Sequence, residues 1–158
     1  MKKRSNYRPK SVLTDPLSML RPVSKERLAP VMLGFLTAIE AMRTGDHPGV
    51  DEWRSLSDAV NTVETLSIHQ KKVDPAEVMP TVNAAIAAMV MASRRFKAGQ
   101  GMRLDGPGLE ALRDVIALYE QCATLFTERE MAMAQAETQR RVNELLRKRG
   151  HHPEVECI

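Results

Sequence analysis

The sequence predicts an all-α fold, and three observations support this prediction. Apolar residues make up 43% of the 158 residues and aromatic residues only 4%, which favours a core of Leu, Val, Ile, Ala and Met, as in helical bundles. Large apolar side chains recur at spacings of three and four, which places them on one face of a helix. Pro, Gly and Asp stand where helices would begin and end. We therefore expect a single domain built as a four-helix bundle.

The expected elements follow from these spacings and end signals. A short helical turn precedes the bundle and ends at Leu20. The main helices are expected at about 24–43, 50–70, 74–97 and 107–126. The first helix should bury a stripe made of Leu33, Leu36, Ile39, Ala41 and Met42. The parts of the chain are then a basic arm, 1–22; a helical core, 23–126; a distal helical segment, 127–150; and a tail, 151–158.

The third helix has the clearest start signal. Asp74 can cap it, Pro75 suits the first helical position, and Glu77 can complete a capping box. Residues 84–92 are apolar on all sides, which predicts a central helix in close contact with its neighbours. Trp53, at the head of the apolar stripe of the second helix, is interpreted as a core residue rather than a binding residue.

The fourth helix is the longest, because no Pro or Gly interrupts the chain between Leu109 and Gly150. One helix over 107–149 would span roughly 65 Å, whereas a compact chain of this length is only about 40 Å across. Either the helix breaks near 127–138 or its distal part projects. A projecting helix with a thin apolar stripe pairs with another protein or with a second copy of the chain, and the alternative is a half-formed solvated tail. The expected partner-binding residues of that stripe are Val142, Leu145 and Leu146.

The first two helices resemble the last two. Pro30, an apolar run and Arg43-Thr44-Gly45 are matched by Pro80, an apolar run and Lys97-Ala98-Gly99. The stripe from Trp53 to Glu64 likewise matches the stripe from Leu109 to Glu120. Two αα-hairpin repeats would explain this pattern, and chance similarity between amphipathic helices is the competing explanation.

The net charge of +3 is unevenly distributed, since both ends of the chain are basic. The candidate contacts to nucleic acid or to an acidic partner are Lys2, Lys3, Arg4, Tyr7, Arg8 and Lys10 in the arm and Arg140, Arg141, Arg147, Lys148 and Arg149 near the other end. A basic arm with one aromatic ring can bind a phosphate backbone through charge and stacking. A disordered, solubilising leader is the alternative interpretation of the arm.

The sequence contains no familiar catalytic or cofactor-binding motif, so we expect no enzyme and no cofactor. Its two cysteines, Cys122 and Cys157, are expected to be a packing residue and a free thiol in a reducing cytosol. Neighbouring His and Glu residues at 151–157 do not impose a coordination geometry, and we expect no metal site there. Without a signal peptide, and with no window approaching about 18 apolar residues, the expected protein is soluble and intracellular.

Three stretches resemble a family of small helical proteins encoded by bacteriophages and prophages of proteobacteria. They are 4–10 (RSNYRPK), 38–45 (AIEAMRTG) and 51–53 (DEW), and the similarity extends to about Arg141. Asn6 departs from the Lys expected there, which lowers the charge of the arm. The family has no established activity and supplies no site residues. The resemblance implies a phage gene product that acts in the bacterial cytoplasm.

Three functions are consistent with these observations. The leading hypothesis is a non-enzymatic interaction protein that modulates host machinery, presenting the arm and the C-terminal helix to a protein partner or to a second copy. The alternative is an accessory protein that binds DNA or RNA without sequence preference. An enzyme with an unrecognised site is the third. We expect neither a membrane nor a small-molecule substrate as a partner.

Overall fold

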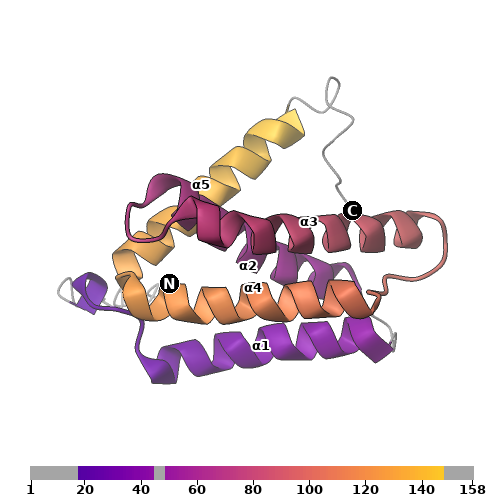
Figure 1. Cartoon of the computed structure of the whole chain (residues 1–158), viewed down its shortest axis with the longest axis horizontal. Helices are drawn as coiled ribbons and strands as arrows, with labels where there is room; N and C mark the ends of the chain where they lie inside the picture. The colour runs from indigo at the N-terminus through magenta and orange to yellow at the C-terminus, as the bar shows by residue number, and fades with distance from the viewer. Residues whose placement is uncertain (1–17, 45–48, 148–158) are drawn as a thin grey trace, which may run out of the picture.

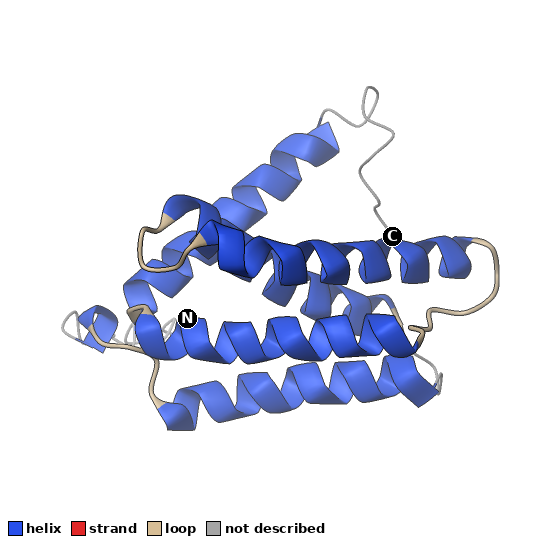
Figure 2. Ribbon diagram, viewed as in Figure 1, coloured by secondary structure: helices blue, strands red, loops and turns tan. Residues whose placement is uncertain are grey.

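Five α-helices follow a 3₁₀ turn in the computed structural model, which describes residues 18–44 and 49–147 (Figures 1 and 2). The elements are η1 Ser18–Leu20, α1 Lys25–Thr44, α2 Val50–His69, α3 Pro75–Lys97, α4 Gly106–Leu125 and α5 Glu128–Arg147. The prediction of an all-α bundle is confirmed. The first four helices begin and end within one residue of the predicted bounds.

Local capping explains why these boundaries were predictable. The Asp74 carboxylate accepts a hydrogen bond from the Ala76 amide at 2.9 Å, and Pro75 begins α3. The Asp105 carboxylate accepts one from the Gly108 amide at 2.9 Å and caps α4. This bond, followed by a second from Arg95, lowers the pKa of Asp105. Both aspartates satisfy amide groups that a helix start leaves without a partner.

The central helix of the bundle is α2, which packs against α1, α3, α4 and α5. Leu56, Val63 and Leu66 are completely buried on it. The buried hydroxyls of Thr62 and Ser67 donate to backbone carbonyls one turn earlier, at 2.7 and 2.8 Å, so their burial leaves no polar group unsatisfied. Central position was predicted for α3 instead, and that prediction is wrong.

Helix α3 packs on α2 and α4 but leaves one face outside the bundle. Ala84, Ala87 and Met91 are exposed on this face, since apolar composition alone does not decide which side a neighbour covers. An 18-residue window of α3 has a mean hydropathy of 1.3 and is 33% buried. Its length and composition therefore meet those of a membrane span, which the sequence analysis did not expect. Core helices of soluble proteins meet the same test.

The predicted stripe of α1 is only partly correct. Ile39 and Met42 are buried as expected, but Leu33 and Leu36 are 66% and 52% exposed. Phe35 lies on the buried side instead, and its ring meets that of Tyr119 edge-on at 5.1 Å. Leu33 stands two positions from Phe35, about 200° away around the helix, so the two cannot face the core together.

The two predicted hairpins, α1–α2 and α3–α4, are both present. The residue pairs that the repeat aligns, Leu56 with Leu112 and Val60 with Ile116, are all buried. Trp53 is half-buried against the core, and its indole N–H donates to the Met89 carbonyl at 3.1 Å between the hairpins. A common origin of the hairpins stays a prediction.

A single unbroken helix over 107–149 is not present, and of the two predicted alternatives the break is found, because the chain turns between Leu125 and Glu128, at the edge of the predicted range 127–138. Phe126 has an extended backbone, and Thr127 and Glu130 form a capping box: the Thr127 hydroxyl accepts from the Glu130 amide at 3.2 Å, and the Glu130 carboxylate accepts from the Thr127 amide at 2.8 Å. Phe126 and Met131, on either side of the cap, are both buried in the core and occupy the two positions of a hydrophobic staple. The break is thus encoded by a helix start, without Pro or Gly.

Candidate interaction surface

Helix α5 is fixed at its beginning by contacts to three other segments. The Glu128 amide donates to the Arg21 carbonyl at 2.8 Å, and the Glu128 carboxylate pairs with Arg27 of α1. The Lys72 ammonium pairs with Glu130 at 2.7 Å and lies 5.1 Å from the centre of the Phe126 ring. Hydrogen bonds from Lys72 and then from the Thr127 amide lower the pKa of Glu130. These contacts set the direction in which α5 leaves the bundle.

The middle of α5 docks on α2 through hydroxyl groups. Thr65 and Thr138 are buried, and their oxygens lie 2.9 Å apart. The Thr138 hydroxyl also lies 3.3 Å from the Asn61 carbonyl. One turn further, Arg141 pairs with Glu64 at 3.2 Å. The contact between α5 and α2 is therefore more polar than the contacts within the first four helices.

The distal end of α5 extends away from the other helices, as Figure 1 shows. Met131, Ala134 and Thr138 are buried, and Val142 and Leu145 continue the same face at helical spacing. Val142 is half-buried and Leu145 is 39% exposed, so the face loses its cover towards the end. Of the predicted partner-binding residues, Val142 and Leu145 lie on this face. The side chain of Leu146 lies outside the described part of the structure.

A cleft of about 320 Å³ lies at the side of this helix, where α1, α2, α4 and α5 meet. Its lining residues are Phe35, Asp58, Ala59, Thr62, Tyr119, Gln135, Thr138 and Gln139. The Gln135 amide donates to the Tyr119 hydroxyl at 3.4 Å across the cleft. Burial raises the pKa of Tyr119, and it also raises the pKa of Asp58, which Arg54 lowers in part.

The lining of the cleft contains one acidic group and several neutral polar groups. Asp58 is the only carboxylate of the cleft lining, and neither a His nor a Cys stands beside it to form a nucleophile and base pair. A positive group entering the cleft would be attracted by the Asp58 carboxylate.

Three of the predicted basic residues lie in the described part of the structure, and two of them are paired within the chain. Arg140 pairs with Glu137 and Glu144, and Arg141 pairs with Glu64, so both are neutralised within the chain. The pairs with Glu137 and Glu144 raise the pKa of Arg140. Arg147 is exposed. The remaining candidates, Lys2, Lys3, Arg4, Tyr7, Arg8, Lys10, Lys148 and Arg149, lie outside the described residues.

Sequence reasoning missed both the anchor and the cleft. The Thr127-x-x-Glu130 pattern was visible as a capping box, but the good helix formers that follow it favoured continuity. The cleft had no local signal, because Phe35, Asp58, Tyr119 and Gln135 come from four helices.

The described residues contain no cluster of three or more metal-ligating side chains. The residues of the His-rich tail, 151–157, lie beyond the described part. Cys122 is buried as expected, and burial raises the pKa of its thiol to about 11, so it is protonated at neutral pH. Cys157 is outside the described ranges.

The fold and surface together define a class: an α-helical bundle whose last helix is docked by polar contacts and exposes its distal face. Comparison with known proteins adds no relative, since no family model, no curated protein and no solved structure matches the chain.

Proposed function

We propose that this chain is a non-enzymatic interaction protein, encoded by a phage or prophage, that uses the distal face of α5 to bind a protein partner and modulate host machinery. The phage origin and the bacterial cytoplasm as its compartment rest on the sequence resemblance alone. The mode of binding rests on the surface described above.

The observation that supports this proposal best is the continuity of the α5 stripe. Residues 131–138 use this face to pack on α2, and Val142 and Leu145 extend the same face to where it is partly uncovered. An amphipathic helix whose apolar stripe extends beyond the helices that cover it is suited to contact a second protein. The cleft with Asp58 at its side supplies polar groups that can fix the orientation of that partner.

The arrangement gives less support to nucleic-acid binding. Arg140 and Arg141 each pair with acids of the same chain, so phosphate binding at these residues would have to break ion pairs. That alternative depends on the arm and on residues 147–149. Val142 and Leu145, which are offered to a protein partner, are apolar, so a partner that binds them does not have to break ion pairs.

Truncation after Gln139 tests the proposal. It removes Val142 and Leu145 but keeps the capping box and the buried contacts of Met131, Ala134 and Thr138. We expect loss of the partner in pull-downs from a bacterial host, while helicity and cooperative thermal unfolding are retained. A truncated protein that keeps its oligomeric state and every interaction of the full chain would overturn the proposal.

A further inference from the structure

The junction between α4 and α5 consists of two residues, Phe126 and Thr127, and its local sequence also suits a continuous helix. Phe126 continues the three- and four-residue spacing of Tyr119 and Ala123, which are buried on α4. The sequence contains neither Pro nor Gly from 109 to 149, and the residues after the junction are mostly good helix formers. No residue of the junction therefore prevents α4 and α5 from forming one helix.

The break between the two helices is stabilised by polar side chains. Thr127 and Glu130 form the capping box, Lys72 pairs with Glu130, and Arg27 pairs with Glu128. The side chains of Lys72 and Arg27 are 41% and 56% exposed, so water and salt weaken both ion pairs. These contacts therefore favour the broken junction only modestly over a continuous helix.

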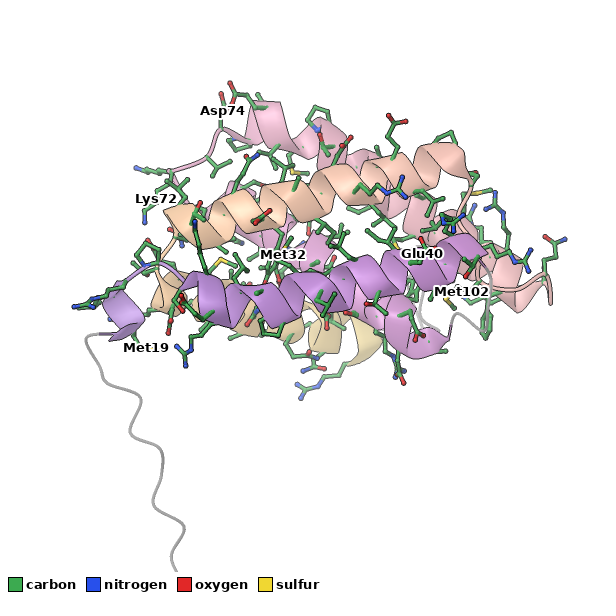
Figure 3. The ribbon with its side chains drawn as sticks, turned by 90° about the horizontal axis from the view of Figure 1, so that it is seen from below. Met19, Met32, Glu40, Lys72, Asp74 and Met102 are labelled. Carbon is green, nitrogen blue, oxygen red and sulfur yellow. The ribbon has the colours of Figure 1, made fainter. Side chains whose placement is uncertain are left out.

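The surface that receives α5 belongs to parts of the chain that precede α4. Thr65 of α2 contacts Thr138, and Glu64 of α2 pairs with Arg141. Lys72, labelled in Figure 3, follows α2 at the end of the bundle where α5 begins. Helix α5 makes most of its contacts with α2 and η1. The same surface on a second copy of the chain would therefore offer α5 the same contacts.

We propose that α5 exchanges between two copies of this chain. In each copy the junction straightens, α4 and α5 form one helix of roughly 60 Å, and α5 docks on α2 of the other copy. The cleft of about 320 Å³ then becomes a shared site, with Gln135 and Gln139 from one copy and Asp58 and Tyr119 from the other. Each contact occurs twice, as a two-fold exchange requires.

The balance between the single chain and the exchanged pair depends on concentration. In the single chain, the short junction holds α5 beside its own α2 at an effective concentration on the order of millimolar. The exchanged pair keeps the docking contacts, loses the cap and gains the hydrogen bonds of a continuous helix. The chain is therefore monomeric when dilute and pairs as its concentration approaches that range. The exchange does not rest on partner binding by Val142 and Leu145, so either proposal can fail without the other.

Arg129 tests the straightened junction. It is exposed and second in α5, where Pro is tolerated because the amide has no helical acceptor. In a continuous helix the same Pro would clash with the Leu125 carbonyl. Light scattering of the full chain should show a mass that rises with concentration from 17.7 kDa towards twice that value for the wild type and for the matched control Arg129→Ala. Arg129→Pro should stay at the monomer mass.

Removal of the cap should act in the opposite direction. Thr127→Ala destabilises only the broken junction, so it should lower the Kd of the pair by about ten-fold. The exchange would be overturned if Arg129→Pro and Arg129→Ala had the same mass at every concentration, or if Thr127→Ala left the Kd unchanged.

Mixed disulfides test which surfaces meet. Thr65→Cys and Thr138→Cys are made as two separate proteins, each with Cys157→Ser, and are unfolded in urea and refolded together at high concentration in an oxidising buffer. The two hydroxyl oxygens lie 2.9 Å apart, so cysteines at these positions are within reach of a disulfide. Exchange should join the two proteins covalently, whereas neither protein alone should cross-link.

The control replaces Thr138→Cys by Met133→Cys, which changes a 58% exposed residue of the same helix, and should give no mixed disulfide with Thr65→Cys. Absence of the mixed disulfide between positions 65 and 138, or equal cross-linking in the control, would contradict the exchange of α5. A dimer that forms through any other surface would give the first of these results.

Discussion

Thr127 and Glu130 decide at the residue scale where α4 gives way to α5. Their side chains satisfy each other's backbone amides, and Lys72 holds the Glu130 carboxylate in place from the loop before α3. Phe126 and Met131 are both buried, and their burial depends on the turn between them. A helix that continued straight through would place these two side chains differently. The junction therefore combines a local signal with contacts from distant segments.

Removing the cap should destabilise the protein. We expect Thr127→Ala to lower the free energy of unfolding by about 1 kcal/mol, because an amide of the first turn loses its acceptor. Thr124→Ala is the control, since its exposed hydroxyl bonds only to the Gln121 carbonyl within α4. Urea unfolding followed by circular dichroism measures both. An equal loss in the two variants would mean that the cap adds nothing specific.

The lowered pKa of Glu130 predicts a pH dependence of stability. Its ionised form is favoured in the folded state, so this contribution is complete above the ordinary pKa of about 4.3 and is lost as the pH falls through the folded value. Glu130→Gln should therefore unfold at a lower temperature than the wild type at pH 7, and the gap should narrow in acid. If the difference in unfolding temperature between the wild type and Glu130→Gln were the same at neutral and acidic pH, the stabilising role of ionised Glu130 would be contradicted.

At the scale of elements, α5 differs from the other helices in how it is held. It joins the apolar core only through Met131 and Ala134 near its beginning and then packs on α2 through the polar residues Thr138 and Arg141, whereas α1 to α4 contribute most of that core. Polar contacts contribute little net free energy, because water competes for the same groups. The expected consequence is that α5 opens more readily than the rest.

Native-state hydrogen exchange tests this expectation. Amides in the distal half of α5 should exchange through local opening, at rates well above those of α2, whose amides should require global unfolding. Thr138→Val should change the exchange of α5 and leave that of α4 unaltered. Equal protection across α2 and α5 would show that the last helix belongs to the same cooperative unit.

An element could be predicted from the sequence where the interactions that form it lie within a few residues of one another. Asp74 and Asp105 act within one turn, so the starts of α3 and α4 could be predicted. The exposure of Leu33 and the burial of Phe35 depend on where α2 and α4 lie, which no local pattern contains. The contact of Thr65 with Thr138 joins residues 73 positions apart and could not be predicted at all.

At the scale of the whole molecule, exchange of α5 between two copies and binding of a partner by its distal face are compatible. An exchanged α5 keeps its contacts to α2, and its distal face still extends beyond the helices that cover it, so a second copy need not exclude a partner (Figure 1). The candidate interface with Asp58, Tyr119 and Gln135 could not be predicted from sequence, because it exists only where the helices meet.

The account also predicts weak binding of nucleic acid by the whole chain. Since Arg140 and Arg141 are paired internally, adding a short DNA duplex at low salt should not change the mass measured after size exclusion. A salt-sensitive shift would favour the basic arm and residues 147–149 as the binding elements, and would make nucleic acid the primary partner.

The most direct test of the central claim compares three full-length proteins in quantitative pull-downs from a bacterial host. They are the wild type, Val142→Asp with Leu145→Asp, and Met133→Asp, which changes a 58% exposed residue elsewhere on the same helix. The account predicts a partner that the wild type and Met133→Asp retain equally and that the double variant loses at least ten-fold. Equal recovery by all three proteins, with their helicity unchanged, would contradict binding through the distal face of α5.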